Sequence, residues 1–184
     1  MDNRKRCAWS EGHPLLSVYH DTEYGFPIEH DHEFLERLVL ELNQAGLSWL
    51  TVLNKRETMR HAFFDFDPKS LAEVVDVEGS GWLEDRGLIR HRGKLNAMVI
   101  NARLFNEIME PAQFLWSFVE NTPVQNNWRK GPEVPVTTEH SIEMAKAFKK
   151  IGFKTNTNMF WPHAAYVIGG GLCQRYFSTE ECDY

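Results

Sequence analysis

The residues best suited to chemistry lie between Leu40 and Trp49, a short stretch that holds a carboxylate, two amides and an indole. On a helix, Glu41 follows Phe34 and Leu38 and precedes Ala45, at steps of four, three and four residues. That spacing places Glu41 on the apolar face of the helix. A glutamate in that position is either paired in the core or faces a pocket.

Four aromatic residues accompany this glutamate in the sequence: Trp9, Tyr19, Tyr24 and Trp49. Aromatic planes stack on nucleobases, and a nearby carboxylate can accept from an exocyclic amine or stabilise a cation. Each aromatic taken alone is better explained by core packing. The glutamate on the apolar face favours a binding site for the set as a whole.

A compact basic turn occupies residues 86–94, with four Lys or Arg, one His and two Gly. Helical patterns on both sides give it the layout of a helix-hairpin-helix, in which glycines let the backbone approach a phosphate. Such contacts position a protein on DNA without reading base identity. A solvated basic loop explains the pattern equally well. The candidate DNA-binding residues are Arg90, His91, Arg92, Gly93 and Lys94.

The potential metal ligands lie towards the two ends of the chain. Cys7 and His20 are near the start, and Cys173 and Cys182 are near the end. Together they would make a Cys₃His zinc site that ties the N-terminal segment to the C-terminal tail. The alternative is three unpaired thiols in a reducing cytosol, since three cysteines do not suggest a disulfide framework.

Helix signals extend over most of the sequence, and no strand pattern or internal repeat is present. We therefore expect an all-α fold in a single domain, residues 1–184, with a helical core at about 31–170. Asp31, Ser48, Asp67 and Ser141 are the expected N-caps, and Gly46 and Gly152 the expected helix ends. Expected helices cover about 31–45, 48–63, 67 onwards, 82–85, 95–109, 111–119, 141–151 and 162–168, with one short helix at most in 7–30.

Composition limits the function classes further. A net charge of −6 does not support a general polyanion binder, so contact with nucleic acid must come from a local basic patch. No apolar run approaches transmembrane length, and the first residues do not resemble a signal peptide. We expect a cytoplasmic monomer that does not bind membranes.

Several motifs together resemble bacterial 3-methyladenine DNA glycosylase I. They are CAW at 7–9, YHD at 19–21, EYG at 23–25, QAGLSWLTVL at 44–53, LIRHRGK at 88–94, WSFV at 116–119 and KKIGFK at 149–154. The resemblance runs in order over residues 7–154. It implies a helix-hairpin-helix DNA glycosylase fold and a role in base-excision repair, in which the N-glycosidic bond of 3-methyladenine in double-stranded DNA is hydrolysed.

By this resemblance, Glu41 and Tyr19 contact the base edge, Trp49 stacks on the base, and Trp9 also lines the pocket. Tyr24 stands where the family usually has tryptophan, so we expect it in the pocket wall as well. An N3-alkylated adenine already carries positive charge, so the enzyme need not supply a strong acid. We expect Glu41 to act as reader and electrostatic stabiliser of a flipped base, not as a nucleophile.

The resemblance also implies a structural zinc whose N-terminal ligands fall on Cys7 and His20. The family's His-x₃-Cys pair is missing from the tail after Lys154. We therefore expect either a changed site completed by Cys173 and Cys182, or loss of the metal. Leu16 and Asn43 also depart from the family, which commonly has an aromatic residue and a glutamine there.

Two other functions fit the same residues. One is an N-glycosylase of shifted substrate range, acting on another modified base or a nucleoside, which the altered pocket positions and tail suggest. The other is a helix-hairpin-helix module that binds DNA without turnover. A carboxylate on an apolar face argues against the second, because a pure binding module has no need for one.

Overall fold

The computed structural model describes residues 6–122, 124, 135 and 137–154. Within this part of the chain all regular structure is helical and no strand is present, so the predicted all-α class is confirmed. The helices are α1 (Ala8–Glu11), α2 (Pro14–Thr22), α3 (Asp31–Gln44), α4 (Trp49–Ala62), α5 (Pro68–Ala72), α6 (Arg92–Glu107), α7 (Pro111–Ser117) and α8 (Glu139–Ile151), with a short 3₁₀ helix η1 (Phe64–Phe66).

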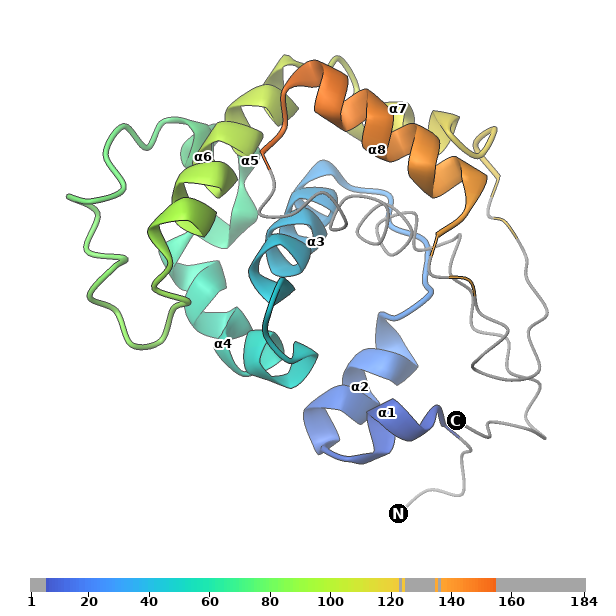
Figure 1. Ribbon diagram of the computed structural model, residues 1–184, viewed down its shortest axis with the longest axis horizontal. Coiled ribbons are helices and arrows are strands. Elements are labelled where there is room, and N and C mark those ends of the chain that lie inside the picture. Colours follow the sequence, from blue (N-terminus) through green and yellow to red (C-terminus); the bar gives the residue numbers. More distant parts are fainter. Residues whose placement is uncertain (1–5, 123, 125–134, 136, 155–184) are drawn as a thin grey trace.

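Helix α3 is the central element of the fold. Figure 1 shows it near the middle of the ribbon, and it contacts α4, η1, α5, α6 and α7. Ten consecutive residues, 34–43, are buried, so the helix is covered on all sides and not along one stripe. Four of these residues are polar, and buried polar groups require partners. The partners of this set define the candidate site.

The helix starts largely follow the predicted caps. Ser48 Oγ accepts from the backbone N–H of Thr51 at 3.1 Å and begins α4, and Asp67 Oδ2 accepts from Ser70 N–H at 2.7 Å and begins α5. The N-cap position of α3 is His30, one residue before the predicted Asp31, and the His30 side chain makes no capping hydrogen bond. Thr138 caps α8 and pairs reciprocally with the predicted Ser141.

The residues that follow α8 are held against α6 by the side chain of Asn101. Gly152 ends the helix with φ of 110°, as its position in the sequence predicted. Asn101 then holds Lys154 through its side-chain amide, donating to the Lys154 carbonyl at 2.9 Å and accepting from the Lys154 N–H at 2.6 Å. The predicted helix at 162–168 lies outside the described residues.

Three expectations about the elements were wrong. The N-terminal segment holds two helices, because His13 Nδ1 caps a separate α2 that opens with Pro14. Residues 82–85 form a turn, with the N–H groups of Glu84 and Asp85 both bonded to the Gly81 carbonyl. The helix expected to reach residue 109 ends at Glu107, and Met109 lies beyond it with 88% of its surface exposed.

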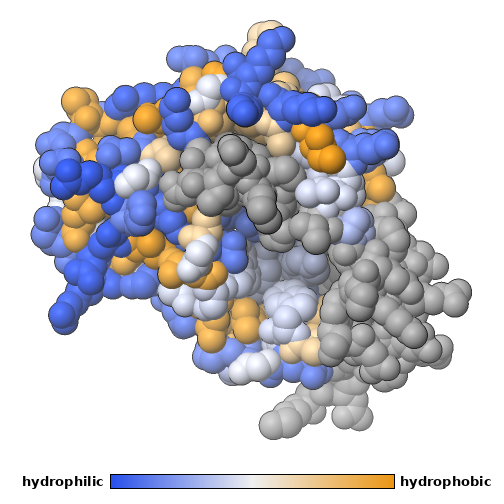
Figure 2. All heavy atoms as spheres, viewed as in Figure 1, coloured by the Kyte–Doolittle hydropathy of each residue, from blue (hydrophilic) through white to orange (hydrophobic). Residues whose placement is uncertain are grey.

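On the face seen in Figure 2, hydrophilic and hydrophobic side chains of the described part are intermingled. Figure 2 shows hydrophilic side chains over much of the visible face, and side chains of intermediate hydropathy gather where α2 lies. No helix in the described ranges is long and apolar enough to cross a membrane.

Candidate active site

The four predicted aromatic residues form one cluster. The Tyr19 ring lies 5.2 Å from Trp49, 6.3 Å from Tyr24 and 6.4 Å from Trp9, measured between ring centroids. Trp9 and Tyr24 meet edge to face at 5.2 Å. Tyr19 is therefore the hub of the cluster, and it joins residues of α1 and α2 to the first residue of α4.

Tyr19 is buried, and its surroundings keep the phenol protonated. Burial raises the pKa of its hydroxyl well above the ordinary value, and the carboxylates of Glu41 and Glu23 raise it further. The positive charges of Arg37 and Arg56 act in the opposite direction without reversing the shift. Tyr19 therefore remains a hydrogen-bond donor throughout the physiological pH range.

Glu41 lies on α3 and is only 3% exposed, as its helical position predicted. It comes one turn after Arg37, which places the two on the same face of α3. Its negative charge acts on the Tyr19 hydroxyl and raises the pKa of that group. The structure thus brings Glu41, Tyr19 and Trp49 together from α3, α2 and α4.

Two buried polar atoms near the junction of α3 and α4 have no hydrogen-bond partner among the described residues. They are Trp49 Nε1, a donor, and Asn43 Oδ1, an acceptor. The Asn43 amide nitrogen, in contrast, donates to the Val39 carbonyl at 2.9 Å. A buried group without a partner is costly, and a ligand that supplies the partner removes that cost.

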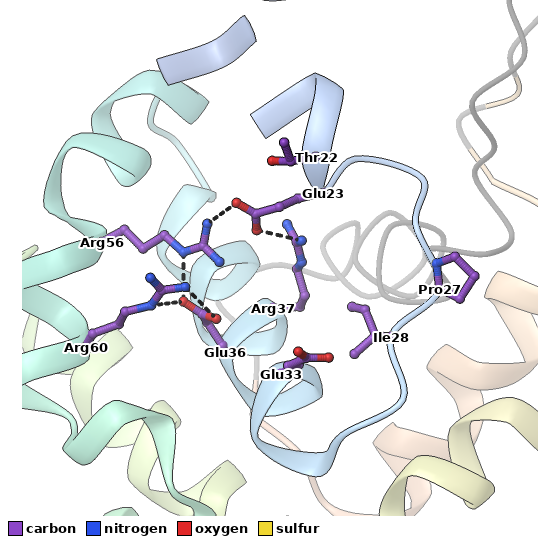
Figure 3. A pocket seen from close by; sticks show the side chains of 9 residues that line it. All are labelled: Thr22, Glu23, Pro27, Ile28, Glu33, Glu36, Arg37, Arg56 and Arg60. Carbon is purple, nitrogen blue, oxygen red and sulfur yellow. Dashed lines mark hydrogen bonds and ion pairs between the residues drawn. The ribbon is translucent and has the colours of Figure 1, made fainter. Parts of the chain in front are cut away.

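Beside the aromatic cluster lies a chain of charged residues that the sequence did not indicate. Arg37 Nη2 and Arg56 Nη1 donate to the two oxygens of Glu23 at 2.9 and 2.7 Å. Arg56 Nε and Arg60 Nε donate to Glu36 Oε1 at 2.7 and 2.9 Å. We call these five residues the ion-pair ladder (Figure 3), and they link α2, α3 and α4.

The ion-pair ladder lines a surface pocket together with Thr22, Pro27, Ile28 and Glu33 (Figure 3). Neither Glu41 nor any residue of the aromatic cluster is in its wall, so this pocket is distinct from the candidate base site. Its arginines are already bonded to Glu23 and Glu36. The pocket is therefore the outer side of a structural network that supports Tyr19.

The basic turn precedes α6 and exposes four of its five predicted DNA-binding residues. Arg90, His91, Arg92 and Gly93 are all exposed. His91 caps α6 by accepting from the Lys94 N–H at Nδ1, at 3.2 Å. A Cβ on Gly93 would lie 3.1 Å from the His91 ring, so glycine allows this close approach.

Lys94 corrects the prediction for this turn. Its side chain is 5% exposed and points into the protein, where Nζ donates to the carbonyls of Asn43 and Ala45 at 2.7 and 2.6 Å. A cation at the carbonyl end of a helix is favourable. The Lys94 ammonium group therefore holds the end of α3 and, contrary to the prediction, is not exposed for contact with DNA.

Of the four predicted zinc ligands, the structure describes Cys7 and His20. Cys7 is fully buried, and His20 Nδ1 lies 3.0 Å from Asp21 Oδ1. Arg6 in turn donates to both Asp21 oxygens. Cys173 and Cys182 lie outside the described residues, and within the described ranges no group of three or more His, Cys, Asp or Glu could hold a metal ion.

Comparison with known proteins gives this arrangement its context. The crystal structure of a 3-methyladenine DNA glycosylase I superposes with a TM-score of 0.83 at 37% identity, covering 91% of this chain and 93% of that one. The Staphylococcus aureus enzyme, solved to show how it recognises 3-methyladenine, gives a TM-score of 0.84 at 26% identity, covering 95% of each chain. The fold is thus that of a helical DNA glycosylase.

Sequence comparison specifies the family. Residues 9–161 match the family described as methyladenine glycosylase. DNA-3-methyladenine glycosylase 1 of Escherichia coli is 40% identical over 154 residues, which cover 82% of each chain. This protein belongs to the methyladenine glycosylase family.

Proposed function

We propose that this protein hydrolyses the N-glycosidic bond of 3-methyladenine in double-stranded DNA, leaving an abasic site. The observation that carries the proposal is the burial of Glu41, whose charge acts on Tyr19, together with the packing of Tyr19 against Trp49. A protonated phenol, a carboxylate and an indole face are the groups needed to read and stack a flipped, cationic base. The family assignment supports the same reaction.

In this mechanism the nucleotide rotates out of the duplex and the base stacks on Trp49. Tyr19 donates to the base edge, and the carboxylate of Glu41 favours the positively charged base over neutral adenine. The C1′–N9 bond breaks with its electron pair passing to the base, which leaves as neutral 3-methyladenine. A water oxygen bonds to C1′ and loses its proton, which completes the hydrolysis.

The exposed part of the basic turn is the proposed contact with the DNA backbone. Arg86, Arg90, His91 and Arg92 are the exposed charged or titratable side chains there, and Gly93 lets the backbone of the α6 start approach a phosphate. Because the chain as a whole is negatively charged, contact with phosphate must come from a local basic patch, and this turn supplies one.

We also propose a structural zinc ligated in part by Cys7 and His20. The orientation of His20 supports it, because pairing of Nδ1 with Asp21 leaves Nε2 as the ligand atom, a common arrangement around metal-binding histidines. A bound zinc would hold the N-terminal segment that carries Trp9 and Tyr19. Cys173 and Cys182 are the candidates for the other two ligands.

The test is release of 3-methyladenine from methylated duplex DNA. Glu41→Gln removes the negative charge at nearly constant shape, and we expect base release to fall by on the order of 100-fold. Glu143→Gln, an exposed position on α8, is the matched control and should retain full activity. A wild-type protein that releases no base would contradict the proposal.

A further inference from the structure

Arg37 covers one face of the Tyr19 ring. Its guanidinium carbon lies 4.9 Å from the ring centroid, within the range of a cation–π contact, and the residue is 7% exposed. Trp9 of α1, Tyr24 in the turn after α2 and Trp49 of α4 approach the same ring. Arg37 is a contact to Tyr19 from α3, the helix that also carries Glu41.

The guanidinium of Arg37 is held in place by the ion-pair ladder (Figure 3). Nη2 donates to Glu23 Oε2 at 2.9 Å, while Glu23 Oε1 accepts from Arg56, which is bonded in turn to Glu36. The backbone N–H of Glu23 also bonds to the Tyr19 carbonyl at 2.9 Å and closes α2. Glu23 therefore fixes both Arg37 and the end of the helix on which Tyr19 lies.

Covering a tyrosine ring with an arginine requires desolvation of the guanidinium charge. Burying an ion pair commonly gains nothing in stability over apolar side chains of similar volume, because desolvation offsets the attraction. Leucine or methionine would bury the same ring surface at no such cost. The planar guanidinium, in contrast, adds a preferred orientation over the ring and a fixed bond to Glu23.

Building on the proposed function, in which Tyr19 contacts the base, we infer that Arg37 is a positioning residue that fixes the Tyr19 ring relative to Glu41. Arg37 and Glu41 are one turn apart on α3, so the distance between them is set by the helix. Contact of Arg37 with Tyr19 extends this rigid spacing to α2. The two groups that read the base edge then meet it in one fixed geometry.

Partial neutralisation by Glu23 makes this arrangement compatible with a cationic base. A lone guanidinium beside the pocket would repel the positive charge of 3-methyladenine. The Glu23 carboxylate at 2.9 Å, which also pairs with Arg56, offsets part of that charge. Arg37 can thus orient Tyr19 with less repulsion of the substrate.

The test combines Arg37→Met with Tyr19→Phe in a double-mutant cycle on base release. Arg37→Met alone should lower kcat/KM for 3-methyladenine release about tenfold or more, because small misplacements of a reading group are costly. In the Tyr19→Phe background, where no hydroxyl remains to be positioned, the same substitution should change kcat/KM by less than about twofold. A purely structural role would give the same factor in both backgrounds.

Arg37→Lys and Arg103→Met complete the experiment. Arg37→Lys keeps the charge but not the planar guanidinium, so its kcat/KM should lie between those of wild type and Arg37→Met. If Arg37→Met does not fold, Arg37→Lys replaces it in the double-mutant cycle. Arg103 donates to the carbonyls of Ala72 and Val74, away from the aromatic cluster. Arg103→Met controls for general loss of an arginine and should leave kcat/KM unchanged.

Equal factors in the two Tyr19 backgrounds, or full activity of Arg37→Met, would overturn the inference. Failure of the wild-type protein to release any base would instead overturn the proposed function. The two failures are thus separated by the wild-type measurement.

Discussion

Lys94 donates from its ammonium group to the Asn43 carbonyl across 2.7 Å, and so joins the first turn of α6 to the last turn of α3. One of these helices begins at the proposed DNA-binding turn, and the other carries Glu41. The bond from Lys94 to Ala45, at 2.6 Å, extends the same joint into the loop that leads to Trp49. The phosphate-binding surface and the base site therefore share one rigid connection.

Replacing Lys94 should weaken both the fold and the reaction. Lys94→Met leaves two carbonyls without their donor, and we expect a loss of roughly 1–3 kcal/mol in the free energy of unfolding. Base release should fall as well, since the end of α3 loses its anchor. Urea unfolding and the base-release assay measure the two effects. Lys55→Met is the control, because Lys55 makes a similar bond to the Arg86 carbonyl in an exposed position. Equal stability of the two variants would contradict the role assigned to Lys94.

Glu36 predicts a pH dependence of stability. Burial acts to raise the pKa of its carboxyl, but hydrogen bonds from Arg56 and Arg60 outweigh burial and hold the pKa below the ordinary value of 4.5. A lowered folded-state pKa stabilises the protein above that ordinary value, and the contribution disappears as the pH falls through the folded-state pKa.

Glu36→Gln should therefore cost roughly 2 kcal/mol at pH 7 and much less in acid, where wild-type Glu36 is protonated as well. Unfolding by urea over a pH series, from pH 7 downward until the wild-type protein loses this contribution, gives the comparison. The matched control is Glu57→Gln, because Glu57 pairs with Arg60 while its side chain is 81% exposed, and it should show little effect at either pH. A Glu36→Gln penalty that is independent of pH would be evidence against the ion-pair ladder.

Arg90 should contribute to DNA affinity through a phosphate and not through a base. For Arg90→Ala, the slope of log affinity against log salt concentration should become shallower by about 0.9, regardless of DNA sequence. Fluorescence anisotropy over a salt series measures this slope. Arg103→Ala, on the far part of α6, should leave it unchanged. An unaltered slope for Arg90→Ala would exclude this side chain from the DNA interface.

Zinc content tests the proposed metal site. The purified full-length protein should contain about one zinc per chain by elemental analysis, and His20→Asn should lose most of it, because His20 would supply one of four ligands. His61→Asn, on the exposed side of α4, should retain the metal. A wild-type content well below one zinc per chain would contradict the site.

Local signals in the sequence predicted the helices that have clear boundaries. Ser48 and Asp67 cap α4 and α5 because their side chains satisfy N–H groups only three residues away, and such short-range bonds are readable from a sequence. Residues 82–85 were predicted to be helical but form a turn. Only two backbone N–H groups, those of Glu84 and Asp85, bond to the Gly81 carbonyl. A single helical turn of that kind does not propagate.

Some residues of the candidate site could likewise be predicted from local sequence, and others could not. Glu41 could be predicted as a site residue because its position in the helical repeat, on the apolar face, is unusual for a carboxylate. Arg37 and Glu36 look like ordinary surface charges, and their partners Glu23 and Arg56 lie 14 and 20 residues away along the chain. Lys94 was misassigned for a related reason, since its acceptors belong to a helix about 50 residues earlier. Only the tertiary fold shows which charges are buried.

The ion-pair ladder also gives the base site a distinctive response to temperature. The hydration free energy of charged groups becomes less favourable on heating, so the cost of burying Arg37, Glu23, Arg56 and Glu36 falls as the temperature rises. The apolar contacts among the other helices gain no such advantage. Warming should therefore loosen peripheral packing before it separates Tyr19 from α3, and the geometry that reads the base should persist close to the melting temperature of the whole domain.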